Sequence, residues 1–299
     1  MSLVDDVNTQ LRSVSSDSLL EGRTKWLVYL PPVLVITVLF IVPVLLVGVT
    51  SVYPRFSGVS ELGFTLQFYS DALNPSYLSS LWRSIWYGVV TTLACLVLGY
   101  PVVYAAVKVF REYEVLILLL SVLPFWVMFL IRMFGWISIL KDGGLFDVIA
   151  TQLGLGIDVA ILYSAPAVII GLIFSWYPLM VFPLYASIKS VDDSLLEASK
   201  DLGANSFRTF FRVTVPQTRS GIIAGSILVF VPSFGSYVTP ILLGGTNSSQ
   251  MLANIIGRQF TSAFNWPLGA ALAMLMLVVV VGCLVVVQRY TTVVEVRER

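Results

Sequence analysis

One polar segment, framed by two long apolar runs, decides the fold. It reads Asp192-Asp193-Ser194-Leu195-Leu196-Glu197-Ala198-Ser199-Lys200-Asp201-Leu202-Gly203, and then Ala204-Asn205-Ser206-Phe207-Arg208-Thr209-Phe210-Phe211-Arg212-Val213-Thr214-Val215-Pro216. Ser194 followed by Glu197 matches a capping box, in which the two side chains satisfy free N–H groups at the start of a helix. Gly203 suits the left-handed residue that ends a helix. The first half of the segment is therefore predicted to be a short helix.

The second half of the segment predicts another short helix. Asn205 or Ser206 suits its N-cap, and Pro216 is expected to close it. Its aromatic side chains share one face at positions i, i+3 and i+4: Phe207, Phe210 and Phe211. We therefore expect a helix, a glycine turn and a second helix within a surface loop of residues 189–220.

The composition of the whole chain excludes a soluble protein. A length of 299 residues corresponds to about two soluble domains. However, 57% of the residues are hydrophobic and 12% are charged, against about 45–50% and 25% in soluble domains. The formal charge of +1 offers no basic face for nucleic acid. We therefore expect an all-α integral membrane protein without a nucleic-acid partner.

The residue types that are missing or rare exclude several chemistries. The chain contains no histidine, which disfavours a zinc site, a Ser-His or Cys-His nucleophile and a histidine proton relay. The two cysteines, Cys95 and Cys283, lie inside apolar runs and are interpreted as small core residues. No catalytic residue and no metal ligand are assigned.

Six runs are long and apolar enough to cross a bilayer core of about 30 Å. They cover residues 26–50, 85–107, 115–140, 165–188, 221–243 and 268–287. We expect a cytoplasmic leader at 1–25, a six-helix transmembrane domain at 26–289 that includes the polar loop, and a cytoplasmic tail at 290–299. Several spans contain Pro or Gly at depth: Pro124, Pro178, Pro183, Pro232, Gly235 and Pro240. These residues indicate either simple kinks or helices broken along a transport pathway.

The positions of Lys and Arg predict the orientation, because cytoplasmic loops carry the excess of these residues. With the N-terminus inside, most of them fall on the cytoplasmic side: Arg12, Arg23, Lys25, Lys108, Arg111, Lys189, Lys200, Arg208, Arg212, Arg219, Arg289, Arg297 and Arg299. Few lie near the outer face: Arg55, Arg83, Lys141 and Arg258. Both termini are therefore predicted to be cytoplasmic.

The polar segment resembles a pattern found in permease subunits of binding-protein-dependent ABC importers. That pattern is Glu-Ala-Ala, three residues, Gly, nine residues and Ile-x-Leu-Pro. The chain matches its spacing with Glu197-Ala198-Ser199, Gly203 and Val213-Thr214-Val215-Pro216. Three positions differ conservatively, with Ser199 for Ala, Val213 for Ile and Val215 for Leu.

The resemblance implies a type I ABC importer permease fold in a prokaryotic inner membrane. It implies that the loop is a coupling helix, which docks on a separate cytoplasmic ATPase through Glu197, Ala198, Ser199, Leu202, Gly203, Phe207 and Pro216. The expected partners are an ATPase dimer, a second permease that is a distinct homologue, and an extracytoplasmic binding protein. The sequence has no Gly-x-x-x-x-Gly-Lys-Ser/Thr motif. We therefore expect no enzyme activity and no cofactor, with ATP and Mg²⁺ bound by the partner ATPase.

Other stretches are similar to the spermidine/putrescine permease subfamily. They include Leu123-Pro124-Phe125-Trp126, the segment from Val229 to Pro240, Leu243-Gly244-Gly245 and Asn265-Trp266-Pro267-Leu268-Gly269. The resemblance implies a polyamine substrate, and permeases for opines, phosphonates or amino-acid-like solutes share parts of the pattern. These other small solutes stay open as alternatives.

Aromatic residues are the candidates for the substrate path, because the six predicted spans contain no Asp or Glu and aromatic faces bind cations. The candidates near Pro or Gly are Trp136, Trp176, Tyr177, Phe234 and Tyr237. Arg132 is the charged residue inside a span, about 17 residues or roughly 26 Å along a straight helix. It either reaches the outer interface or lines a path for an anionic or zwitterionic substrate.

Two further classes of function remain as alternatives. An ion-coupled secondary transporter is disfavoured because the spans lack the acidic residues of coupling-ion sites. An intramembrane enzyme is disfavoured further, because neither histidine nor a carboxylate in a span is present as a general acid or base.

Overall fold

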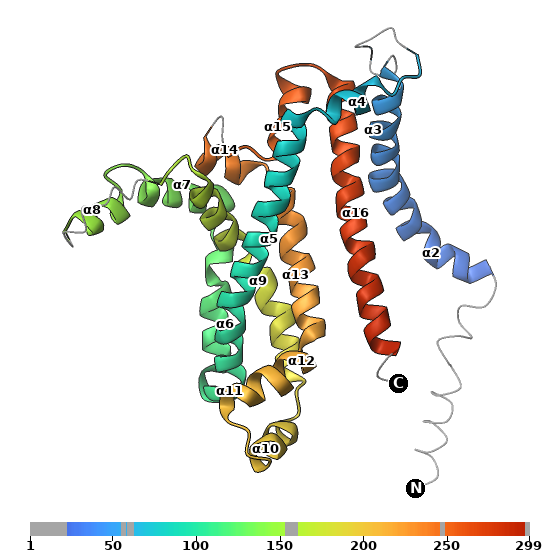
Figure 1. Ribbon diagram of the computed structural model, residues 1–299. Helices are drawn as coiled ribbons and strands as arrows, with labels where there is room; N and C mark the ends of the chain where they lie inside the picture. The colour runs from blue at the N-terminus through green and yellow to red at the C-terminus, as the bar shows by residue number, and fades with distance from the viewer. Residues whose placement is uncertain (1–22, 55–57, 59–62, 153–160, 246–248, 297–299) are drawn as a thin grey trace.

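The structure is a computed structural model that describes residues 23–54, 58, 63–152, 161–245 and 249–296. Within these ranges the regular secondary structure is helical (Figure 1). Four helices are long and apolar enough to cross a membrane without a sharp bend. They are α2–η2–α3 (Arg23–Ile36, Thr37–Ile41, Val42–Val52), α5–η4 (Pro75–Tyr104, Ala105–Val109), α9 (Ala165–Lys189) and α16 (Trp266–Val296). The first, second, fourth and sixth predicted spans are confirmed.

Helix α5 begins ten residues before its predicted start. The side chain of Asn74 caps it by accepting a hydrogen bond of 3.1 Å from the N–H of Ser76. Pro75 occupies the first turn, where its missing N–H costs no hydrogen bond. Arg83 therefore lies inside the helix, and its guanidinium donates 3.0 Å to the carbonyl oxygen of Gln250.

The third and fifth predicted spans are not single straight helices. The third consists of α6 (Glu114–Val122), the 3₁₀ turn η6 (Leu123–Trp126) and α7 (Phe129–Leu140), with a bend of 92°. The fifth consists of α13 (Arg219–Phe234) and α14 (Val238–Gly244), with a bend of 64°. The third bends where Val127 and Met128 have extended backbones after Pro124. Counting each bent pair as one span gives six spans.

The prolines inside α9 break nothing, although Pro178 and Pro183 each remove a backbone donor. Helices α5 and α13 pack along α9 at the centre of the bundle (Figure 1). Pro178 is itself buried in this packing. Proline is therefore present inside three unbroken spans, as Pro101 of α5 and Pro31 and Pro32 of α2 also show, and accompanies sharp bends in two others.

A buried core joins the central helices. One cluster includes Val103 of α5, Met180 and Leu184 of α9, and Val229 of α13. Tyr100 adds a polar contact there, since its hydroxyl lies 2.7 Å from the Oγ1 atom of Thr218 in the buried interior. The centre of the molecule is therefore a three-helix core to which α6 packs on one side.

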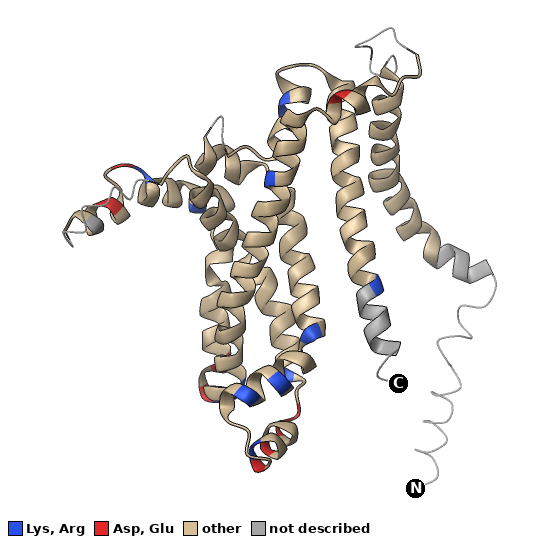
Figure 2. Ribbon diagram, in the orientation of Figure 1, with Lys and Arg blue, Asp and Glu red and all other residues tan. Residues whose placement is uncertain are grey.

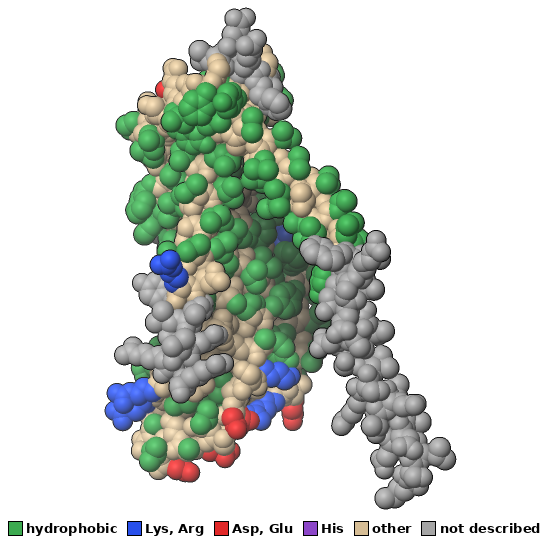
Figure 3. Space-filling view, turned by 90° about the vertical axis from the view of Figure 1, so that its right-hand side faces the viewer, with side chains coloured by type: hydrophobic (Ala, Val, Ile, Leu, Met, Phe, Trp, Pro, Cys, Tyr) green, Lys and Arg blue, Asp and Glu red, His purple; other side chains and the backbone are tan. Residues whose placement is uncertain are grey.

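Helices α3 and α16 form a second pair beside this core (Figure 1). They are joined at one end to the short helices α4 (Gln67–Ala72) and α15 (Leu252–Thr261). The span Tyr29–Val52 leaves its apolar side chains largely exposed within the chain, and Figure 3 shows hydrophobic side chains over much of the face on this side. Such a surface suits contact with lipid or with another membrane subunit.

Charged side chains gather at the two ends of the bundle and leave the stretch between them uncharged (Figure 2). One end carries α10 (Asp193–Asp201) and α11 (Ser206–Thr209). The opposite end carries α7, α14 and α15. This banding is the pattern that a bilayer imposes on a helical protein.

Candidate functional site

Helix α10 starts two residues earlier than the capping box predicts. Asp192 is the N-cap, and its Oδ1 atom accepts a 2.9 Å hydrogen bond from the N–H of Ser194. This bond holds the pKa of Asp192 below its usual range. The prediction that Ser194 caps the helix is therefore wrong, because Ser194 already lies in the first turn. The side chain of Glu197 projects from the next turn and is exposed.

The glycine turn is confirmed. Gly203 has a φ of +80°, in the left-handed region that favours glycine. Its N–H donates 2.8 Å to the carbonyl of Lys200, and the N–H of Ala204 donates 3.1 Å to the carbonyl of Ser199. A Cβ atom at this position would meet nothing within 4 Å. The backbone conformation alone therefore requires glycine here.

The second helix is longer than predicted. The side chain of Asn205 caps it, since its Oδ1 atom accepts 2.8 Å from the N–H of Arg208. Pro216 does not end it, because the chain continues through η7 (Phe210–Thr214) into α12 (Val215–Gln217). η7 is a π-helical turn in which Val215 donates to Phe210, and the register shift places Pro216 in the first turn of α12.

The three phenylalanines of this helix have different surroundings. Phe210 packs edge-to-face on Tyr100 and Tyr104 of α5, with ring centroids 5.2 Å apart in both pairs. Phe207 is 73% exposed and Phe211 is 53% exposed. Phe210 therefore fixes the helix to the bundle, while the other two rings face outward.

Helices α10 and α11–α12 enclose a groove of about 520 Å³. It is lined by Leu195, Ala198, Ser199, Leu202, Ala204, Arg208, Arg212, Val213, Pro216 and Gln217. A contact of 2.8 Å between the hydroxyls of Ser199 and Thr209 joins the two helices. Leu202 is 89% exposed, and Figure 3 shows hydrophobic patches among the charged side chains at this end. The groove thus combines apolar side chains with Ser199, Gln217 and two arginines.

Of the seven residues predicted to couple to the ATPase, four line this groove: Ala198, Ser199, Leu202 and Pro216. Glu197 and Phe207 are exposed beside it, and Gly203 makes the turn that brings the two helices together. The structure thus gathers the predicted coupling residues at one end of the molecule.

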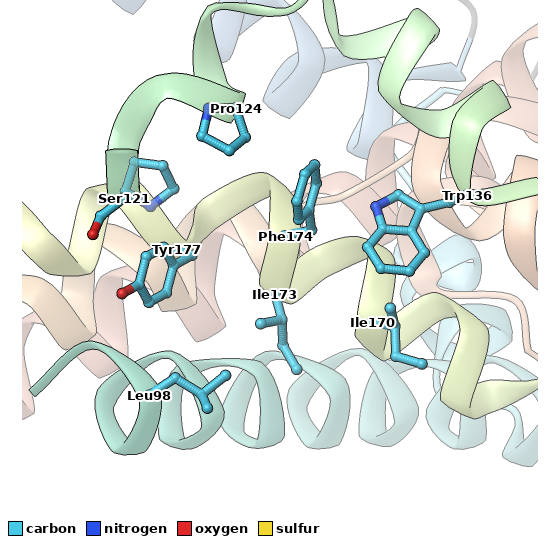
Figure 4. A pocket seen from close by; sticks show the side chains of 9 residues that line it. Leu98, Ser121, Pro124, Trp136, Ile170, Ile173, Phe174 and Tyr177 are labelled. Carbon is cyan, nitrogen blue, oxygen red and sulfur yellow. The ribbon is translucent and has the colours of Figure 1, made fainter. Parts of the chain in front are cut away.

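A second cavity, of about 350 Å³, lies between α5, α6, α7 and α9 and is open on one side. It is lined by Leu98, Ser121, Pro124, Trp136, Ile170, Ile173, Phe174, Tyr177 and Pro178. Trp136 and Tyr177 lie on either side of Phe174 (Figure 4). The rings of Trp136 and Phe174 meet edge-to-face at 5.3 Å. Two of the predicted pathway aromatics therefore share one aromatic cavity.

The other predicted pathway residues lie elsewhere. Trp176 packs against the core clusters of α5 and α9. Phe234 is fully buried and stacks on Phe230 at 5.8 Å. Tyr237 lies at the bend between α13 and α14, where its carbonyl accepts from the amide of Asn254. The structure does not bring all five aromatics into one cluster.

Arg132 lies on α7, beyond the 92° bend. The distance of roughly 26 Å along a straight helix therefore does not apply to it. Its guanidinium carbon is 5.4 Å from the ring centroid of Phe125 and 5.8 Å from that of Phe129. Its Nε and one Nη atom are buried without a hydrogen-bond partner in the described part of the chain.

The sequence analysis missed a set of ion pairs beside α10. Asp193 lies 2.9 Å from Lys108 and 2.7 Å from Arg111. A third pair joins Lys189 to Glu114 at 2.6 Å. The paired residues are separated by 75 to 85 positions, so no local spacing rule connects them.

Comparison with known proteins identifies the family. The model of the binding-protein-dependent transport system inner membrane component matches residues 96–295, which include both the groove and the aromatic cavity. The chain belongs to this family. The permease thus belongs to the family that the polar segment of residues 192–216 resembles, and it has the helical fold class that the sequence predicts.

Two curated relatives are similar to the permease over most of their length. The spermidine/putrescine transport system permease protein PotB of Haemophilus influenzae is 38% identical over 78% of this chain and 82% of the relative. The protein of the same name from Escherichia coli is 36% identical over 83% of this chain and 90% of the relative.

Solved structures show the same fold. A chain of a bacterial ABC transporter for the import of alginate has a TM-score of 0.68 at 17% identity, covering 89% of the permease and 96% of that chain. A chain of the MetNI methionine ABC transporter has a TM-score of 0.54 at 16% identity, covering 73% and 95%. The permease therefore has the fold of type I ABC importer permeases.

Proposed function

We propose that the chain is a permease subunit of an ABC importer for polyamines such as spermidine and putrescine. The observation that carries the proposal is 36–38% identity to two proteins named for this transport over 82% and 90% of their length. The aromatic cavity around Trp136 and Tyr177 supports it, because aromatic faces attract ammonium groups where no carboxylate is present.

The groove between α10 and α12 is the proposed docking surface for a cytoplasmic ATPase. Its exposed apolar residues, above all Leu202, suit burial in a partner. The end of the bundle that carries it is then cytoplasmic, in agreement with the predicted excess of Lys and Arg. This orientation agrees with the expectation that both chain termini are cytoplasmic.

The remaining partners follow from the family. A dimer of ATPase subunits supplies ATP and Mg²⁺ binding, a second permease of distinct sequence completes the pathway, and an extracytoplasmic binding protein delivers the solute. This chain then has no cofactor of its own and performs no hydrolysis.

A permease for an anionic or zwitterionic solute is the second candidate, and Arg132 favours it. Its partly buried guanidinium keeps two nitrogen atoms without a hydrogen-bond partner among the described residues. Opines and phosphonates carry groups that would accept from these atoms. The two rings beside Arg132 are the competing explanation, since they stabilise the cation without a solute.

The test is purification of the tagged chain from its own membranes in mild detergent. The proteins that accompany it are identified, and the assembly is placed in liposomes with its binding protein. We expect vanadate-sensitive ATP hydrolysis and uptake of labelled spermidine. Stimulation by a phosphonate or an opine, with none by spermidine, would establish the second candidate. A chain that transports without any ATPase would refute both.

A further inference from the structure

Few apolar contacts hold helix α10 on the bundle. None of its nine residues is buried. It is linked to the second helix of the segment by the hydroxyl contact between Ser199 and Thr209. Val191, just before the helix, is buried, and the N-terminal end of α10 is otherwise held by polar contacts.

Lys108 supplies such a contact from a different part of the fold. It lies in η4, the π-helical end of α5, and its side chain is only 7% exposed. Its Nζ atom donates 2.8 Å to the carbonyl of Val191 and 2.9 Å to Oδ1 of Asp193, the first residue of α10. A buried ammonium requires partners of this kind, because an unpaired charge there is strongly unfavourable.

Arg111 occupies the other oxygen of the same carboxylate. Its guanidinium lies in the turn between α5 and α6 and donates 2.7 Å to Oδ2 of Asp193. The two cations hold the pKa of Asp193 below its usual range, so the carboxylate is ionised at neutral pH. Both oxygens of Asp193 are thus bound to the α5–α6 turn.

A second ionic link lies on the α9 side of the same junction. Glu114, the first residue of α6, accepts 2.6 Å from Lys189 and 2.7 Å from the hydroxyl of Tyr185, both on α9. The α5–α6 turn is therefore tied to the end of α9 and to the start of α10. A force applied to α10 would therefore be transmitted through these ion pairs to α5, α6 and α9.

We propose that Lys108 and Arg111, acting through Asp193, are positioning residues that hold the N-terminal end of α10 on the α5–α6 turn. A displacement of α10 then moves α5 and α6 together with α9. The inference rests on the proposed function, in which an ATPase displaces α10. It adds a defined mechanical link between the docking surface and the bundle.

The test uses the complete transporter with its binding protein. Lys108→Met keeps the length of the side chain and removes its charge, and Asp193→Asn removes the shared carboxylate. We expect unchanged co-purification of the ATPase, together with a fall of about five-fold or more in the ratio of substrate-stimulated to basal hydrolysis, the low end of typical coupling. Uptake falls by a similar factor. Lys108→Arg is expected to restore much of both.

Glu112→Gln is the matched control. Glu112 lies in the same turn, is exposed, and has no ion pair among the residues that the structure describes. It is expected to behave as wild type. If Lys108→Met fails to assemble, Asp193→Asn and Arg111→Gln decide the question, because their side chains are 44% and 59% exposed. Wild-type stimulation and uptake in these two variants would overturn the proposal.

A distance measurement separates this link from a general loss of stability. Spin labels on Tyr113 and Lys200, which are both exposed, report the separation of the α5–α6 turn from α10. We expect a narrow distribution in the wild type and a broad one in Asp193→Asn. An equally narrow distribution in both would contradict the proposal. If the wild-type assembly contains no ATPase, the proposed function fails instead, and the distance result still shows whether Asp193 positions α10.

Discussion

The close packing of α13 on α9 depends on a glycine. Gly221 and Gly225 of α13 are four residues apart, a spacing that lets membrane helices pack closely. A Cβ atom at Gly221 would lie 2.4 Å from the Cβ atom of Ser187 and 2.6 Å from the carbonyl oxygen of Pro183. The carbonyl belongs to the backbone and cannot rotate away. To lengthen the 2.4 Å contact with Ser187 to 3.4 Å, the two helices must move apart locally by about 1 Å.

The size of the effect follows from two opposing terms. Extra atoms in a well-packed core cost about 1–3 kcal/mol. Replacing glycine by alanine inside a helix returns roughly 0.5–1 kcal/mol. Gly221→Ala is therefore expected to lower the free energy of unfolding by about 1–2 kcal/mol. The corresponding fall in melting temperature is on the order of 5 °C.

Two other glycines provide matched controls in a thermal melt followed by tryptophan fluorescence in detergent. At Gly225 the Cβ atom would meet the Sδ atom of Met180 at 2.6 Å, and this flexible side chain has freedom to move. At Gly282, in α16, the Cβ atom would meet nothing within 4 Å. We expect Gly221→Ala to be the least stable and Gly225→Ala to be intermediate, whereas Gly282→Ala gains only the helix-propensity term and melts slightly above the wild type.

Removal of the Cβ atom of Ser187 tests whether its clash with the added methyl group at position 221 causes the loss of stability. In the double variant with Ser187→Gly, the contact at 2.4 Å disappears while the one with the Pro183 carbonyl remains. Partial recovery of the melting temperature is therefore expected. The reasoning is refuted if Gly221→Ala melts at the same temperature as Gly282→Ala, or if Ser187→Gly lowers it further.

Three further predictions concern the candidate sites. Gly203→Pro and Glu197→Lys are expected to insert in the membrane but to lose substrate-stimulated ATP hydrolysis. Proline cannot adopt the φ of +80° at position 203, and Glu197 lies exposed beside the groove. Wild-type stimulation in both variants would contradict this. Trp136→Ala is expected to weaken polyamine uptake more than Tyr177→Phe, which keeps the ring, with ATPase assembly unchanged in both; equal uptake kinetics would remove the cavity from the pathway. Because the pKa of Asp193 is lowered, the stabilisation of α10 by its ion pairs is complete above about pH 4 and is lost as the pH falls through the folded-state pKa. A spin label on α10 should therefore become mobile only in acid. In Asp193→Asn the same label should be mobile at every pH.

The four unbroken spans could be predicted because a long apolar helix has few alternatives in a membrane. The two bends could not be predicted from hydropathy, which is equally high on both sides of Pro124. Proline itself is ambiguous, since α9 contains Pro178 and Pro183 without a break. Whether a proline bends a helix depends on the neighbours that support it, and these come from distant parts of the chain.

The start of α10 shows the same limit at the level of one residue. Both Asp192 and Ser194 are good N-caps, and the local pattern with Glu197 favours Ser194. The structure places Asp193 in the first turn, where Lys108 and Arg111 bind its carboxylate. A start at Ser194 would leave Asp193 outside the helix. Asp192 and Ser194 are both adequate caps, and the observed start at Asp192 goes together with contacts of Asp193 to residues more than 80 positions away.

The Lys and Arg residues that predict the orientation differ in their surroundings, and a count of charges does not reveal this difference. Lys108, Arg111 and Lys189 all belong to the excess on the predicted cytoplasmic side, and each of them is paired with a carboxylate. Arg208 and Arg212 belong to the same excess, yet they line the groove. A charge bias therefore indicates which side a loop occupies, while only the fold separates the cations that are paired within the chain from those that line the groove.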